Sequence, residues 1–93
     1  MARKFPMSTI CTLHKNITVK GLTYSRIGSW YMERVDFVNY DLSHGGTKLC
    51  RVYGDTARAV VGEIRTPADK AGVKSLLHIL GYEYEEGKYD YVK

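Results

Sequence analysis

The chain has 93 residues, of which 44% are hydrophobic and 26% charged, and its formal net charge is +4. This length leaves room for one domain, residues 1–93, with one modest core, and the composition excludes a low-complexity chain. No segment approaches the ~20 apolar residues of a membrane span, and the N-terminus lacks the apolar run of a signal peptide, so we expect a cytoplasmic protein without a membrane partner.

The positive charge is concentrated at the start of the chain. The first acidic residue is Glu33, whereas five basic residues precede it, namely Arg3, Lys4, Lys15, Lys20 and Arg26. Residues 1–8 are predicted to be a flexible basic tail. A one-sided positive charge attracts anionic partners but does not identify them.

The N-terminal half favours strands. Residues 17–20 alternate between apolar and polar, and the alternation shifts by one position at Gly21, as it does at a β-bulge. Residues 30–42 are rich in aromatic and β-branched side chains, which favours a strand, although four of them also lie on one helical stripe. Residues 44–46 then connect to the next strand.

A hairpin is predicted over residues 47–64, with the Gly-Asp pair at 54–55 as a two-residue turn. In this register one face is small and apolar, which suits a packed helix. The other face holds Tyr53, and Arg51 and Arg58 lie opposite each other across the strands.

One helix is predicted from Pro67 to Leu80. Thr66 suits the N-cap, Asp69 places a negative charge in the first turn, and apolar residues recur at helical spacing up to Gly81, a typical left-handed end. Gly72 weakens this helix by roughly 1 kcal/mol relative to alanine.

After the helix the period changes to two, which predicts a C-terminal hairpin. Residues 82–85 and 88–91 alternate tyrosines with charged residues around a Glu-Gly turn. A loop with an even number of residues collects all the tyrosines on one face: Tyr82, Tyr84, Tyr89 and Tyr91.

Together these elements predict an α+β fold, a small mostly antiparallel sheet of about five or six strands with one helix on one face. A winged helix-turn-helix is the alternative. In that arrangement Asp55 begins a helix that ends at Arg65, and the tyrosine hairpin is the wing.

Basic residues interleaved with aromatic residues predict a binding surface. Guanidinium groups hold phosphates and flat rings stack on unpaired bases, so this mixture indicates contact with single-stranded nucleic acid or with its backbone. The rings could equally belong to the core and the cations to an ordinary solvated face. The predicted site residues are Lys20, Tyr24, Arg26, Trp30, Arg51, Tyr53 and Arg58.

The alternative is a small protein-binding modulator, an inhibitor or adaptor. It would bind an acidic protein or a complex that handles nucleic acid, through the same basic face or through the tyrosine hairpin. The unpaired edges of an open antiparallel sheet also allow a homodimer.

No enzyme is predicted, because the chain lacks a Gly-rich phosphate loop, a nucleophile elbow and a His-Glu-x-x-His motif. Four residues are possible zinc ligands: Cys11, His14, His44 and Cys50. They include no closely spaced cysteine pair, and no third group orients Cys11 and His14 as a catalytic pair. We therefore expect neither a metal nor a cofactor.

Overall fold

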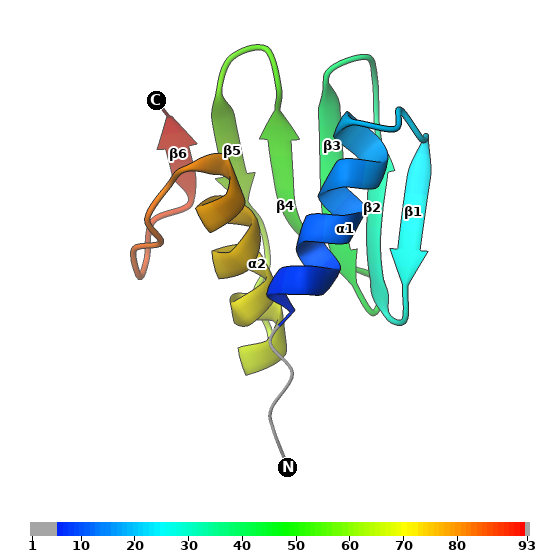
Figure 1. Cartoon of the computed structure of the whole chain (residues 1–93). Coiled ribbons are helices and arrows are strands. Elements are labelled where there is room, and N and C mark those ends of the chain that lie inside the picture. Colours follow the sequence, from blue (N-terminus) through cyan, green and yellow to red (C-terminus); the bar gives the residue numbers. More distant parts are fainter. Residues whose placement is uncertain (1–5, 93) are drawn as a thin grey trace.

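A computed structural model describes residues 6–92 and places two helices on one face of a six-stranded antiparallel sheet (Figure 1). The elements in chain order are α1 (Met7–Thr18), β1 (Tyr24–Ile27), β2 (Trp30–Arg34), β3 (Asn39–His44), β4 (Thr47–Tyr53), β5 (Arg58–Val61), α2 (Pro67–Leu80) and β6 (Asp90–Val92).

The strands lie in the sheet in the same order as in the chain, from β1 at one edge to β6 at the other. Every neighbouring pair is antiparallel, and α2 connects β5 to β6. This arrangement confirms the α+β prediction. The winged alternative is not observed, because residues 55–65 contain β5 rather than a helix.

Helix α1 was missed by the sequence analysis, which predicted one helix and a strand over residues 17–20. Ile10, Leu13 and Ile17 are fully buried, at the spacing of one helical face. The alternation over residues 17–20 resembles a strand because it is only four residues long and begins in the last turn of α1. Met7 and Ser8, assigned to the tail, belong to α1, and residues 1–5 lie outside the described part.

Residues 30–42 form two strands rather than one, because the chain reverses after Arg34. One carboxylate oxygen of Asp36 accepts hydrogen bonds from the backbone N–H groups of Val38 (3.1 Å) and Asn39 (3.0 Å). An aspartate that bonds to the backbone two and three residues later is a typical turn former. The aromatic and β-branched content on both sides obscured this turn.

The predicted hairpin at 47–64 is present, but its register differs by two residues. The connection spans four residues, 54–57, so Tyr53 lies opposite Arg58 and Arg51 opposite Val60. The expected pairing of Arg51 with Arg58 is therefore wrong. Because the shift is even, each side chain keeps its predicted face.

Helix α2 has the predicted bounds and ends. The Thr66 hydroxyl accepts from the N–H of Asp69, the Asp69 carboxylate accepts from the N–H of Thr66, and Gly81 ends the helix in the left-handed region at φ 90°. Thr66 and Asp69 thus form a capping box, in which each side chain binds the other residue's backbone.

The predicted tyrosine hairpin is wrong, since residues 82–85 form no strand and β6 pairs with β5 instead. Tyr91 is 1% exposed and its hydroxyl exchanges hydrogen bonds with the backbone of Glu85. Tyr82 donates its hydroxyl hydrogen to the carbonyl of Ala57. Tyr91 therefore belongs to the core, Tyr82 is bonded to the turn after β4, and Tyr89 is 58% exposed. The four tyrosines thus do not form the single tyrosine face that was predicted.

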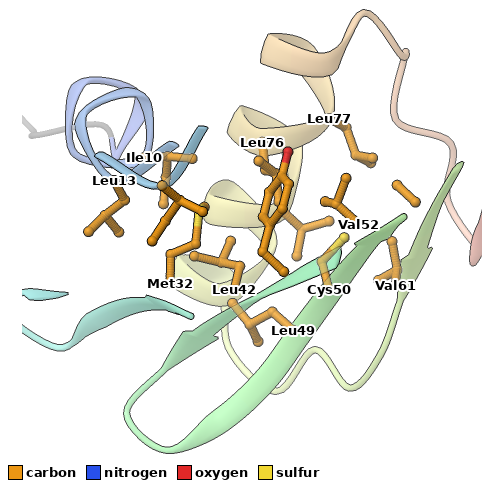
Figure 2. Close-up of a cluster of buried hydrophobic side chains, with 14 of the residues drawn as sticks. Ile10, Leu13, Met32, Leu42, Leu49, Cys50, Val52, Val61, Leu76 and Leu77 are labelled. Carbon is orange, nitrogen blue, oxygen red and sulfur yellow. The ribbon is translucent and has the colours of Figure 1, made fainter. Parts of the chain in front are cut away.

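The core lies between the helices and the inner face of the sheet (Figure 2). Apolar stripes of both helices cover alternate residues of the strands, which is how a two-layer α+β domain buries its apolar surface. The buried apolar residues are Ile10, Leu13, Ile17, Met32, Tyr40, Leu42, Leu49, Cys50, Val52, Ala59, Val61, Val73, Leu76, Leu77 and Tyr91.

Candidate interaction surface

The helices cover one face of the sheet, and strand alternation directs every second side chain to the opposite, uncovered face. We call this uncovered face the open face. Its members follow from the strand register: Tyr24, Arg26, Tyr31, Glu33, Asn39, Asp41, Ser43, Lys48, Arg51, Tyr53, Arg58, Val60, Asp90 and Val92.

An aromatic cluster lies at the β1 end of the open face. Arg26 and Tyr31 are cross-strand neighbours, and the guanidinium carbon of Arg26 lies 5.0 Å from the centre of the Tyr31 ring. The Tyr24 and Tyr31 rings are 6.0 Å apart. A cation over a ring is attracted by the ring quadrupole. Tyr24, Arg26 and Tyr31 therefore form one contiguous cluster on the surface.

A second cluster lies where β4, β5 and β6 meet. The guanidinium carbon of Arg58 lies 5.7 Å from the centre of the Tyr53 ring. Arg58 also donates two hydrogen bonds to the carboxylate of Asp90, from Nε at 2.8 Å and from Nη2 at 2.9 Å. Those bonds raise the pKa of Arg58 and lower that of Asp90. The carboxylate thus occupies the donor fork that a phosphate would need.

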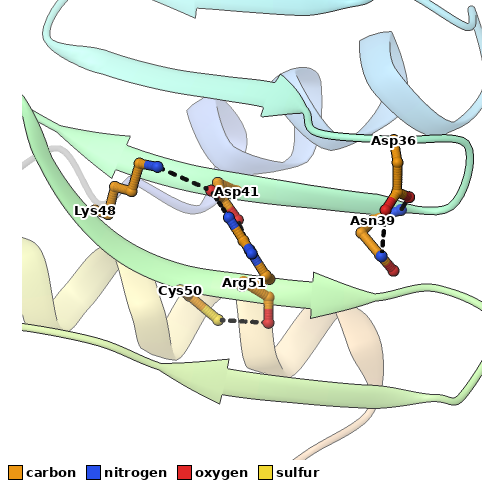
Figure 3. Close-up of polar contacts among 6 residues, drawn as sticks. All are labelled: Asp36, Asn39, Asp41, Lys48, Cys50 and Arg51. Atoms are coloured by element: carbon orange, nitrogen blue, oxygen red, sulfur yellow. Dashed lines mark hydrogen bonds and ion pairs between the residues drawn. The ribbon is translucent and has the colours of Figure 1, made fainter.

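The centre of the open face holds a second arginine–carboxylate pair, which Figure 3 shows on the side of the sheet away from the helices. Arg51 donates to Asp41 from Nε at 2.7 Å and from Nη2 at 2.9 Å, and Lys48 Nζ lies 3.6 Å from the same carboxylate. Asp41 is only 4% exposed. Hydrogen bonding to Asp41 raises the pKa of Arg51, so this guanidinium is held by its own strand neighbour.

The structure brings five of the seven predicted site residues onto the open face: Tyr24, Arg26, Arg51, Tyr53 and Arg58. Lys20 lies in the connection between α1 and β1. Trp30 lies on the helix side, where its ring stacks on His44 with centroids 3.9 Å apart and contacts α2 at Gly72.

The acidic members of the open face were missed. Four cations, including Arg26 and Lys48, stand against three acids, Glu33, Asp41 and Asp90, so the face is close to neutral. The Asp41 partner depends on the register between β3 and β4, which shifts at a bulge between Leu42 and Ser43. The pairing of Arg58 with Asp90 depends on the position of β6 beside β5, whereas the sequence analysis placed these residues in a C-terminal hairpin.

The four possible zinc ligands do not converge. His14 Nε2 lies 2.9 Å from the Tyr40 hydroxyl, His44 Nδ1 lies 2.7 Å from Asp69 Oδ1, and Cys50 is buried in the core. Cys11 is partly exposed on α1. Within residues 6–92 no group of three or more His, Cys, Asp or Glu side chains is close enough to hold a metal ion.

Neither helix within the described range is long and apolar enough to cross a bilayer. Comparison of the chain with protein-family models, with curated proteins and with solved structures gives no match. The open face therefore has to be interpreted from its own chemistry.

Proposed function

We propose that this chain is a non-enzymatic binding module whose open face binds the acidic surface of another protein. The observation that carries the proposal is the composition of that face, in which tyrosines and arginines are in mutual contact and four cations stand against three acids. Tyrosine and arginine are enriched in the energetically important part of protein interfaces.

The pairing of the arginines favours a protein over nucleic acid as the partner. Arg51 and Arg58 each bind a carboxylate through two hydrogen bonds, so binding a phosphate there would first require the release of Asp41 or Asp90. Phosphate contacts dominate the affinity for nucleic acid and depend on cations that release counterions. Two of the four cations on the face are thus already neutralised.

The net charge of +4 still favours an acidic partner, because long-range attraction accelerates the encounter with an oppositely charged surface. On the open face, Tyr24 is 61% exposed and Arg26 has no ion-pair partner among residues 6–92. These two side chains, with Tyr31 beside them, are the part of the face most available for contact.

A matched pair of variants tests the proposal. Tyr24→Ser/Arg26→Ser removes one exposed ring and one cation from the open face. Tyr89→Ser/Lys20→Ser removes one exposed ring and one cation outside the open face. Tyr89 is 58% exposed and lines the groove beside the connection from β5 to α2, and Lys20 lies between α1 and β1. Each protein is immobilised and exposed to a nuclease-treated extract of its own cells, and the retained proteins are identified by mass spectrometry.

We expect a protein that is retained by the wild type and by Tyr89→Ser/Lys20→Ser and lost with the open-face variant. Equal retention by both variants would contradict the proposal. Fluorescence anisotropy with a single-stranded oligonucleotide runs in parallel. Binding that requires Tyr24 and Arg26, with a log–log salt slope of about 0.7 to 0.9 per phosphate contact, would assign the face to nucleic acid instead.

A further inference from the structure

Phe37 is the most exposed large apolar residue in the described chain, at 94% of its surface. It lies in the turn between β2 and β3, and Val35 and Val38 beside it are also exposed. A fully hydrated phenyl ring costs free energy that burial would recover, so such a ring suggests a contact surface.

The turn that carries Phe37 is held in place. Arg34 donates from Nη1 to the carbonyl oxygen of Phe37 (2.6 Å) and from Nη2 to the carbonyl oxygen of Ile17 at the end of α1. The N–H of Gly54 donates to the carbonyl oxygen of Val38 at 3.0 Å, and a Cβ at Gly54 would collide with that oxygen. A side chain presented by a fixed backbone loses little entropy on binding.

An apolar pocket opens at the same end of the molecule, with a volume of about 620 Å³. We call it the helix-end pocket, because it lies between the C-terminal ends of α1 and α2 and the turns that follow β2 and β4. Its apolar walls include Val38, Val52 and Leu80, and Thr18 and His14 line the α1 side. A dry apolar cavity of about 150 Å³ already binds benzene, so a phenyl ring fits with room to spare.

Two further features mark this pocket as a binding site. The hydrogen-bonded His14 and Tyr40 side chains are among its polar groups. Ala57, which also lines it, has a positive φ of 49° and accepts the Tyr82 hydroxyl. Apolar walls with a few converging polar groups and a strained backbone are typical of ligand sites.

We propose that two copies of this chain associate by reciprocal insertion of Phe37 into the helix-end pocket of the other copy. The exposed ring and the pocket lie side by side, since Val38 follows Phe37 and lines the pocket. One two-fold axis can therefore satisfy both at once, which is the requirement of an isologous interface.

The pocket also carries positive charge. Its lining holds two arginines, Arg34 and Arg58, against one acid, Asp55, and Asp36 carries a carboxylate next to Phe37. Arg58 is already paired with Asp90, so Arg34 is the cation that the Asp36 carboxylate of the other copy can approach.

The Tyr24, Arg26 and Tyr31 cluster lies on β1 and β2 and forms no part of the pocket lining, whereas Tyr53 and Arg58 belong to both the open face and the pocket. The observations behind this inference are Phe37 and the pocket, so it does not rest on the proposed function of the open face.

Sedimentation velocity from micromolar to millimolar concentration tests the proposal. We expect the average mass of the wild type to rise with concentration from the 10.6 kDa of a monomer. Phe37→Ala removes both insertions, and each ring in a desolvated pocket accounts for roughly a tenfold change, so the dimer should weaken about a hundredfold. Because Phe37 is exposed, the variant is expected to fold, and its melting temperature checks this.

A second variant keeps Phe37 and closes the pocket. Thr18→Arg places a long cation at the pocket wall, whereas Thr12→Arg is its control, because Thr12 is also exposed on α1, makes the same type of hydroxyl bond to its own helix and lies outside the pocket. Thr18→Arg should abolish the dimer and Thr12→Arg should preserve it.

Mixing Phe37→Ala with Thr18→Arg restores one insertion per pair, because one copy contributes the pocket and the other the ring. The mixture should therefore associate about tenfold more weakly than the wild type but more strongly than either variant alone. A wild type that stays monomeric at every concentration overturns the proposal. So does a Phe37→Ala dimer of unchanged strength, which would place the contact at the sheet edges, or a mixture that does not associate.

Discussion

Arg51 on β4 and Asp41 on β3 are direct cross-strand neighbours, and the guanidinium of Arg51 forms two hydrogen bonds with a carboxylate that is almost completely covered. Arg58 and Asp90 form a pair of the same geometry on the same face, but there both partners are about half exposed. The two pairs therefore allow a buried carboxylate to be compared with an exposed one that has the same hydrogen-bond geometry.

Arg51→Ala leaves the buried carboxylate of Asp41 with Lys48 as its remaining cation, at 3.6 Å. We expect the free energy of unfolding to fall by about 1–3 kcal/mol, the cost of a buried polar group that loses its partner. Arg58→Ala exposes a carboxylate that water already reaches, so its loss should be much smaller. Urea denaturation of both variants checks the difference, and equal losses would show that burial of Asp41 is unimportant.

Gly72→Ala tests the contact between α2 and the ring of Trp30. An alanine Cβ at this position would overlap ring atoms Cζ3 and Cη2 of Trp30, which is stacked on His44. The helix gains about 1 kcal/mol of intrinsic propensity, but forcing an extra group into a packed site costs about 1–3 kcal/mol.

We therefore expect Gly72→Ala to lower the free energy of unfolding and to shift the Trp30 fluorescence maximum to longer wavelength as the ring moves toward water. Denaturation and emission spectra of the same samples check both effects. Higher stability with an unchanged spectrum would mean that the helix propensity decides and the ring contact does not.

The capping box of α2 makes the free energy of unfolding depend on pH in the acidic range. Burial alone would raise the pKa of Asp69, but hydrogen bonds from His44 and from the N–H groups of Arg65 and Thr66 lower it below the ordinary 3.8. The folded chain thus releases this proton more readily than the unfolded chain. The stabilisation is present above about pH 3.8 and is lost as the pH falls through the lower pKa of the folded state.

Asp69→Asn should therefore lose about 1–2 kcal/mol near neutral pH. The difference from the wild type should shrink in acid, where the wild-type carboxyl is itself neutral. Urea denaturation over a pH series measures this difference directly. A difference that stays constant down to the acid limit would contradict the assignment.

His14 makes stability depend on pH in a higher range. Burial lowers the pKa of its imidazole below the ordinary value of 6.5. The unfolded chain therefore binds this proton more readily, so His14 contributes a loss of stability as the pH falls through 6.5 toward the pKa of the folded state. His14→Gln, which retains a partner for the Tyr40 hydroxyl, should remove this part of the dependence.

A proton NMR titration of the His14 ring in the folded wild type measures the pKa of His14 directly, and we expect a midpoint below 6.5. Burial also raises the pKa of Tyr40, the hydrogen-bond partner of His14, to about 12. An alkaline titration of the Tyr40 hydroxyl therefore reports burial of the same pair of side chains. A His14 midpoint at or above its ordinary value would remove the basis of the prediction.

The candidate surface was predicted only in part from the sequence. The alternation of β4 and β5 placed Arg51, Tyr53 and Arg58 on one outer face, and this holds in the structure because a register shift of two residues preserves faces. Their partners were not predicted, because Asp41 and Asp90 come from strands whose pairing depends on turn length and on β6.

The sequence left open whether Trp30 belongs to the core or to the surface. An aromatic residue among basic residues fits a binding surface as well as a core. Only the packing of Gly72 against the ring, with His44 stacked on it, places Trp30 between the sheet and α2.

The sequence by itself determined the features that depend on near neighbours: the length and ends of α2, the strand β4 and the α+β class. Helix caps and side-chain periodicity act over a few residues, so they can be read locally. The tertiary structure alone decided that Arg51 and Arg58 are neutralised by carboxylates and that Phe37 stands beside a pocket. Each of these depends on groups that are distant in the chain and are brought together only when both helices cover the same face of the sheet.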